Sequence, residues 1–301
     1  SPERFREAEG ACHRALTRQS DKSRNWEVYL ALAELHRMAG EPTQAEDQIN
    51  FALAQRADLP QIYISQGKTL ADLGRHGQAV AAFERAIELN PGYWDAHLEF
   101  GNYYYNRANP DYEQAIFHYQ KILDIEPDYT RALISLGSAR YMNNQPELAK
   151  QAWDKSESTA ATESRGNLAV VFTNRGLSSY YDEDFAAAVD WQLRAIELNP
   201  TEHKYWGRLA ESYRGLGDGE KEQETYLEAI KHGLEAERIN PNNWETLGLL
   251  GLYYAYTNQP NESTRYQRAM LDVAPDNSTA LYFASLASLE IGELEVAMQH
   301  L

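Results

Sequence analysis

The sequence predicts an all-α fold built from repeated pairs of helices, and three observations lead to this prediction. Small residues recur along the chain, and four of the seven intervals between them are 34 residues long. Prolines recur near the ends of these intervals, where they stop a helix because proline lacks an amide hydrogen and restricts the residue before it. Valine and isoleucine runs with the period of two that marks a strand are missing from the sequence.

The recurring small residues form columns, as expected where the two antiparallel helices of a pair cross closely. The first column is Ala33, Gly67, Gly101, Gly137, Gly176, Ala210, Gly251 and Ser285. A second column follows at Ala45, Ala79, Ala115, Ala149, Ala188 and Ala297, with Glu222 and Ser263 as departures. Glycine-containing segments such as 38–41, 73–77 and 215–218 predict the turns between the two helices of a pair.

These columns divide the chain into helix-pair repeats, each with a first and a second helix. We expect seven full repeats and a partial one at either end: 1–25, 26–59, 60–93, 94–129, 130–163, 169–202, 203–241, 242–277 and 278–301. Three departures are local: extra residues around 108–110, an insertion near 163–168, and a lengthened helix at 220–239. A single repeat cannot bury its apolar face, so stacking of neighbours supplies the core.

The pattern resembles the tetratricopeptide repeat family. Its best copy combines Gly67 and Leu70 with Ala79, Phe83, Ala86 and Pro91, which follows the family's small-residue, aromatic and proline spacing. The resemblance implies a right-handed α-α superhelix, one solenoid over residues 1–301, with first helices on a concave face and second helices outside. It also implies a protein–protein interaction module.

Composition restricts the class of partner. The 301 residues carry a formal charge of −17 and one cysteine. Nucleic acid is excluded as a partner because phosphate binding needs a basic surface, and a basic protein or peptide fits better. No apolar stretch reaches 18 residues, so we expect no membrane contact by this segment. The single cysteine is typical of a reducing compartment, and we expect a cytoplasmic location.

The sequence predicts no enzyme, no cofactor and no metal site. Cys12 falls where a core residue of a second helix belongs, so packing is favoured over nucleophilic chemistry. Glycines 215, 217 and 219 belong to a turn between helices with no strand before them, unlike a phosphate loop. The acidic run 182–184 also lies in a turn, where capping of the next helix accounts for it.

The family resemblance implies that the second, fifth, sixth, ninth, twelfth and thirteenth positions of each repeat project from the concave face. The candidate partner-binding residues are Lys68, Asn102, Tyr105, Arg131, Tyr141, Asn174, Tyr180, Tyr181, Lys204, Arg208 and Glu211. Three of them, Tyr105, Tyr141 and Tyr180, occupy the twelfth position of successive repeats. Such an aromatic row suits peptide binding, although tyrosine at this position also serves packing.

Three candidates match half of a motif known in the family. Asn174, Lys204 and Arg208 correspond to the distal half of the clamp with which some members grip a terminal carboxylate. The proximal half of the clamp is missing, because Ile134 and Ser138 occupy the positions where the clamp has lysine and asparagine. The sequence therefore leaves open a local basic site without a complete clamp.

Two functions remain open on the sequence. The first is a module that binds a peptide or protein along the concave face, as the binding or sensing region of a larger signalling or assembly protein. The alternative is a self-associating structural domain, so that a homo-oligomer forms.

Overall fold

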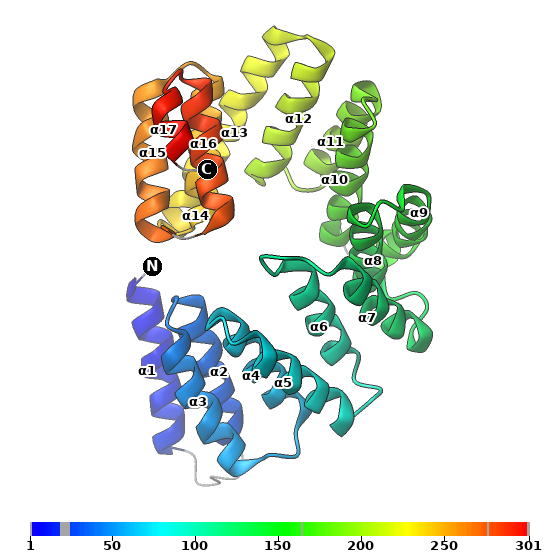
Figure 1. Ribbon diagram of the computed structural model, residues 1–301, viewed down its shortest axis with the longest axis vertical. Coiled ribbons are helices and arrows are strands. Elements are labelled where there is room, and N and C mark those ends of the chain that lie inside the picture. The colour runs from blue at the N-terminus through cyan, green and yellow to red at the C-terminus, as the bar shows by residue number, and fades with distance from the viewer. Residues whose placement is uncertain (1, 19–24, 164, 276, 300–301) are drawn as a thin grey trace. The chain divides into compact units, whose positions relative to one another are not determined.

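The computed structural model describes residues 2–18, 25–163, 165–275 and 277–299. These residues form 17 helices and no strand, which confirms the predicted all-α class (Figure 1). Contacts divide the chain into two compact units, Ser1–Ala149 and Lys150–Leu301, called unit 1 and unit 2 below.

Unit 1 consists of eight helices and the start of a ninth. They are α1 (Pro2–Arg18), α2 (Asn25–Met38), α3 (Pro42–Gln55), α4 (Pro60–Asp72), α5 (His76–Leu89), α6 (Trp94–Asn106), α7 (Tyr112–Ile125), α8 (Thr130–Met142) and α9 (Pro146–Glu163). Within this unit α2, α4 and α6 pack most extensively on α3, α5 and α7, and α4 also contacts both α2 and α6. The first helices of successive repeats therefore share one surface.

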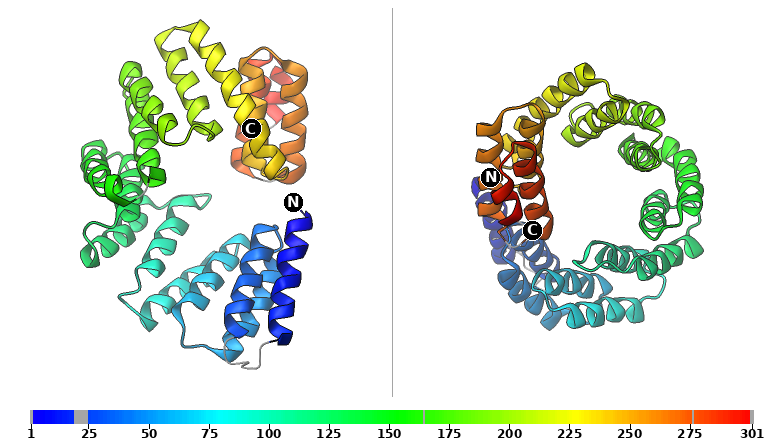
Figure 2. Two further views of the ribbon diagram at one scale, coloured as in Figure 1. Left: turned by 180° about the vertical axis from the view of Figure 1, so that it is seen from behind. Right: turned by 45° about the horizontal axis from the view of Figure 1, so that its top comes forward.

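Unit 2 repeats the arrangement. Its helices after α9 are α10 (Arg165–Tyr181), α11 (Phe185–Leu198), α12 (His203–Leu216), α13 (Gly219–Ile239), α14 (Trp244–Tyr256), α15 (Pro260–Val273), α16 (Ser278–Glu290) and α17 (Leu294–Gln299). The pairs α10–α11, α12–α13 and α14–α15 lie side by side in all views (Figure 2). The lengthened helix predicted at 220–239 is α13, whereas the insertion expected near 163–168 includes residue 164, which lies outside the described residues.

Several turns within pairs use one residue in the left-handed conformation. Gly40, Gly74 and Gly217 have φ of 75°, 71° and 74°, and the predicted turns at these glycines are confirmed. Glu183 takes the same role with φ of 60°. The side chain of Asp184 then accepts a hydrogen bond from the Ala187 amide at 3.1 Å, so the acidic run caps α11 as predicted.

The small-residue columns lie at the helix crossings. Ala79, Ala115 and Ala188 are fully buried, and Gly67 and Gly101 are buried as well. A ring from the paired second helix fills the space above each glycine, Phe83 over Gly67 and Tyr119 over Gly101. The absence of a side chain on the first helix is thus what allows an aromatic residue on the second helix to enter the core.

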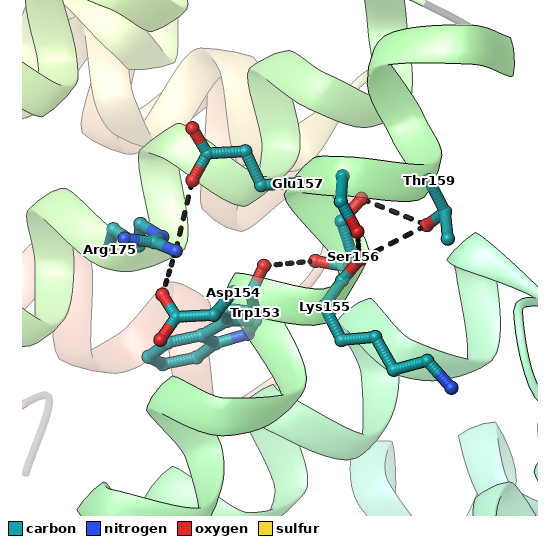
Figure 3. Close-up of polar contacts among 8 residues, drawn as sticks. Trp153, Asp154, Lys155, Ser156, Glu157, Thr159 and Arg175 are labelled. Atoms are coloured by element: carbon teal, nitrogen blue, oxygen red, sulfur yellow. Dashed lines mark hydrogen bonds and ion pairs between the residues drawn. The ribbon is translucent and has the colours of Figure 1, made fainter.

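In unit 2 an arginine joins three helices. Arg175 on α10 forms ion pairs with Asp154 and with Glu157, the latter at 3.0 Å, both on α9 (Figure 3). Its guanidinium also lies 4.7 Å from the ring centre of Trp191 on α11. This cation–π and ion-pair cluster gives Arg175 a structural role.

We predict that Gly101→Ala destabilises unit 1 by about 1–3 kcal/mol, although alanine is the better helix former. A Cβ at this position would lie 2.5 Å from Cε1 of Tyr119. Tyr119 cannot move aside easily, because it is 2% exposed and its hydroxyl is hydrogen-bonded. Urea unfolding followed by circular dichroism would measure the change.

Gly77→Ala is the matched control for this prediction, because a Cβ built at Gly77 in α5 would meet no atom of the described residues within 4 Å, apart from its chain neighbours and its own helix backbone. We expect the control to leave stability unchanged or slightly raised. Equal stability of the two variants would mean that the Gly101 crossing is not a close contact.

Candidate binding surface

All eleven candidate residues lie on first helices. Lys68 is on α4; Asn102 and Tyr105 are on α6; Arg131 and Tyr141 are on α8; Asn174, Tyr180 and Tyr181 are on α10; Lys204, Arg208 and Glu211 are on α12. The structure brings two of them, Lys68 and Asn102, together in one groove of unit 1. The other candidates lie elsewhere in unit 1 or in unit 2.

The groove has a volume of about 500 Å³ and lies where α4 and α6 meet. We call it the α4–α6 groove. Its lining residues are Arg37, Lys68, Ala71, Asp72, His76, Phe83, Glu99, Asn102, Tyr103, Asn106, Arg107 and Ala108. Fully buried Phe83 contributes to its base, and most of the other lining residues are polar. The groove is therefore a mainly polar hollow whose base includes the ring of Phe83.

One wall of the groove is an ion-pair network between α2 and α4. Arg37 lies 3.0 Å from a carboxylate oxygen of Glu34 and 2.9 Å from one of Asp72. Lys68 lies further from Glu34, with 3.6 Å between its Nζ and the nearer carboxylate oxygen. The hydrogen bond from Arg37 lowers the pKa of Glu34, so this wall stays charged at neutral pH. The Lys68 amine is the more loosely held of the two cations.

The opposite wall is a face of α6 that carries two asparagines one turn apart. The Tyr119 hydroxyl donates to Oδ1 of Asn102 at 2.9 Å, which leaves the amide NH₂ group of Asn102 as a donor. Nδ2 of Asn106 donates to the Asn102 carbonyl at 2.9 Å, which leaves its own Oδ1 as an acceptor. The two amides therefore offer one donor and one acceptor, as a peptide bond requires.

The remaining candidates of unit 1 lie outside the groove lining. Tyr105 is partly buried against Tyr112, with 5.5 Å between the ring centres, and burial raises the pKa of Tyr105. Arg131 is exposed and Tyr141 is partly exposed on α8. Packing thus accounts for much of the Tyr105 ring.

In unit 2, Lys204 is already in an ion pair. Its Nζ lies 2.6 Å from Oε2 of Glu245 on α14, 41 residues away along the chain. An incoming carboxylate would have to displace this acid. The other two residues of the half-clamp, Asn174 on α10 and Arg208 on α12, are partly buried.

Glu211 lies among tyrosines from three neighbouring helices. Its carboxylate interacts electrostatically with Tyr180 on α10, Tyr226 on α13 and Tyr253 on α14. Burial raises the pKa of Glu211, and the nearby Arg208 and Arg214 oppose that rise. Tyr181, by contrast, is 63% exposed.

Three further observations bear on chemistry. The described residues contain no group of three or more histidine, cysteine or acidic side chains placed to hold a metal ion. Partial burial raises the pKa of the Cys12 thiol, which disfavours the reactive thiolate. None of the described helices combines the length and apolar character needed to cross a bilayer.

Sequence reasoning missed most of the groove. Glu99 and Asn106 occupy the sixth and thirteenth positions of the repeat 94–129, so the positional rule that selected Asn102 could have selected them too. His76 and Tyr103 carry no such signal, since they reach the groove through the packing of α5 against α6.

The fold is that of a helical-repeat protein in which the first helices of successive repeats pack side by side. Family models of the tetratricopeptide repeat match residues 64–130 and 26–49. The chain therefore contains tetratricopeptide repeats, and such repeats are generally non-catalytic modules for protein–protein interaction. Among curated proteins, none matches the chain by sequence.

Several solved structures share the fold. A chain of the APC/C hetero-tetramer Cut9–Hcn1 is 16% identical, with a TM-score of 0.55, and the match covers 94% of this chain and 52% of that one. Our chain thus spans about half of the length of that relative. PilF of Pseudomonas aeruginosa is 19% identical over 78% of this chain and 96% of its own, with a TM-score of 0.52. A monomeric IFIT1 mutant with m7Gppp-AAAA is 15% identical over 98% and 71%, with a TM-score of 0.61.

Proposed function

We propose that this chain binds an extended, basic peptide segment of a partner protein on its first-helix surface, with the α4–α6 groove as one part of the site. The observation that carries the proposal is the groove itself, where Lys68 and Asn102 from adjacent first helices face one hollow of about 500 Å³. Asn102 and Asn106 supply the donor and the acceptor that a peptide bond needs.

Charge supports a basic partner. Unit 1 carries 15 lysines and arginines against 21 acids, and unit 2 carries 13 against 24. A basic segment would be attracted to either unit before contact. The IFIT1 structure has a similar fold and contains m7Gppp-AAAA. The net charge of −17 on the present chain would repel the phosphates of such a ligand. A protein partner is therefore the better fit.

We propose further that the chain is the binding region of a larger cytoplasmic signalling or assembly protein. The similarity to a chain of the Cut9–Hcn1 hetero-tetramer, which is itself a multichain assembly, supports a role in assembly. The single cysteine supports a reducing compartment.

The test is selection of a displayed random dodecapeptide library on the full chain. We expect enriched peptides to be basic and to associate more slowly as salt rises, because exposed charges are screened beyond about 10 Å at 0.1 M. Asn102→Ala should weaken an enriched peptide roughly tenfold, since a buried polar partner loses its hydrogen bond. Surface plasmon resonance at two ionic strengths would measure both effects.

Asn50→Ala, an exposed asparagine on the second helix α3, is the matched control and should bind as the parent does. If both variants bind enriched peptides alike, the first-helix surface is not the site. If no peptide is enriched and light scattering shows a mass that rises with concentration, self-association replaces peptide binding as the function.

A further inference from the structure

The charges of the α4–α6 groove leave one acid without a cation. Each of its three cations has a carboxylate partner: Arg37 has Glu34 and Asp72, Lys68 has Glu34, and Arg107 has Asp111 at 3.8 Å. Glu99 lines the same groove and is partly buried, and it has no ion pair or hydrogen bond within the described residues. The uncompensated charge of the groove is therefore negative and is located at Glu99.

A second unsatisfied group lies one helical turn from Glu99. Tyr103 also lines the groove, is 9% exposed, and its hydroxyl is buried without a hydrogen-bond partner among the described residues. Residues four apart on a helix share a face with about 5–6 Å between their Cβ atoms. A buried polar group without a partner costs free energy, so a ligand that bonds this hydroxyl gains by satisfying it.

The base of the groove is aromatic. The ring of Tyr103 lies 5.7 Å from that of Phe83 and 6.2 Å from that of His76. A planar guanidinium has five N–H donors in a fixed arrangement and stacks on aromatic faces, whereas an ammonium is a compact, strongly hydrated charge. The acceptors at Glu99 and Tyr103 suit such a donor-rich planar group.

We propose that the α4–α6 groove contains a subsite for an arginine side chain of the partner, with the guanidinium held by the Glu99 carboxylate and the Tyr103 hydroxyl. This inference rests on the proposed peptide-binding function and specifies which residue the groove recognises. Asn102 donates from its NH₂ group to the partner's main chain beside that arginine. The ion pairs of Arg37 and Lys68 keep the other wall from repelling the incoming cation.

The experiment uses the full chain and the tripeptide probe acetyl-Ala-Arg-Ala-amide, with lysine and citrulline versions of the same length. Citrulline has nearly the shape of arginine without its charge. We expect the arginine probe to bind at least tenfold more tightly than the citrulline probe, because a charge-assisted pair is lost, and more tightly than the lysine probe. Chemical-shift titration by NMR measures all three affinities.

Two variants locate the binding. Glu99→Gln should weaken the arginine probe about tenfold and nearly abolish its preference over citrulline. Tyr103→Phe should weaken it severalfold while stability stays equal or rises, because the variant removes an unsatisfied buried hydroxyl. Glu113→Gln, which removes an exposed acid on α7, is the matched control and should bind as the parent does.

Equal affinities for arginine and citrulline, or parent-like binding by Glu99→Gln, would overturn the proposal. Equal affinities for arginine and lysine would overturn the choice of guanidinium. The tripeptide results do not depend on the library selection. If the enriched dodecapeptides contain no arginine but lose affinity with Asn102→Ala, the arginine subsite is refuted and the proposed peptide-binding function is not. Tripeptide binding without any enriched dodecapeptide refutes the proposed function alone.

Discussion

Phe83→Ala is expected to lower the free energy of unfolding of unit 1 by about 3–5 kcal/mol, the usual cost of removing a buried phenyl ring from a core. Phe83 is fully buried, with its ring stacked 5.0 Å from that of Phe100. It also fills the space above Gly67, where a Cβ would lie 2.8 Å from Cζ of Phe83. The cavity left behind faces two helices and cannot close without moving both. Hydrogen exchange of the α4 and α5 amides would measure the loss.

Phe117→Ala is the matched control, since this ring is 50% exposed on α7. The same deletion there should cost less than about 1 kcal/mol, because little apolar surface returns to water. A small effect of Phe83→Ala, similar to that of Phe117→Ala, would contradict the packing of α4 on α5 described above.

A pair of buried histidines should make the stability of unit 1 sensitive to mild acid. His97 on α6 and His118 on α7 are 7% and 5% exposed, and their Nδ1 atoms lie 3.0 Å apart. Burial lowers the pKa of His118 to about 4, with a further contribution from the charge of His97. Burial likewise lowers the pKa of His97, and the charge of Lys121 adds to this effect. Both rings are therefore neutral in the folded chain at neutral pH.

The direction in which stability changes with pH follows from the protons taken up on unfolding. An unfolded histidine takes up a proton near pH 6.5, whereas folded His118 does so only near pH 4. Unfolding therefore binds protons between these values, and stability is lost as pH falls through that window. The pKa difference, at about 1.4 kcal/mol per pH unit, gives a loss of about 3 kcal/mol from His118. Urea unfolding at several pH values from 7 to 4 would measure it.

His118→Gln should flatten this pH dependence, since the amide cannot take up the proton. His13→Gln, which removes an exposed histidine of α1, should leave the pH dependence as in the parent. A parent chain whose stability is constant from pH 7 to 4, or a His118→Gln chain as acid-sensitive as the parent, would contradict the buried pair.

The fold was predictable because its determinants are local. Gly101 marks a helix crossing, Gly74 a turn and Pro91 a helix end by their own covalent properties, so they carry the same meaning in every repeat. The small residues at the crossings are buried as the columns require.

The binding surface was only partly predictable, because its polar contacts join distant residues. The positional rule selected Lys68 and Asn102, both of which line the groove, but it could not indicate that Lys204 is paired with Glu245 from another repeat. Nor could it show that Glu99 has no cationic partner among the described residues, since that depends on which carboxylates pair with Arg37, Lys68 and Arg107. These properties arise from side-chain packing, which a repeat pattern does not encode.

The hydrogen bond between Tyr119 and Asn102 joins the core to the surface. Tyr119 fills the space above Gly101 with its ring and orients the Asn102 amide with its hydroxyl. In the preceding repeat the corresponding aromatic residue is Phe83, which has no hydroxyl to offer. Introducing the asparagine alone into another repeat would therefore give an amide that no tyrosine hydroxyl orients. The transferable element is a pair of residues 17 positions apart, and a designed repeat that recognises a peptide main chain in this way needs both.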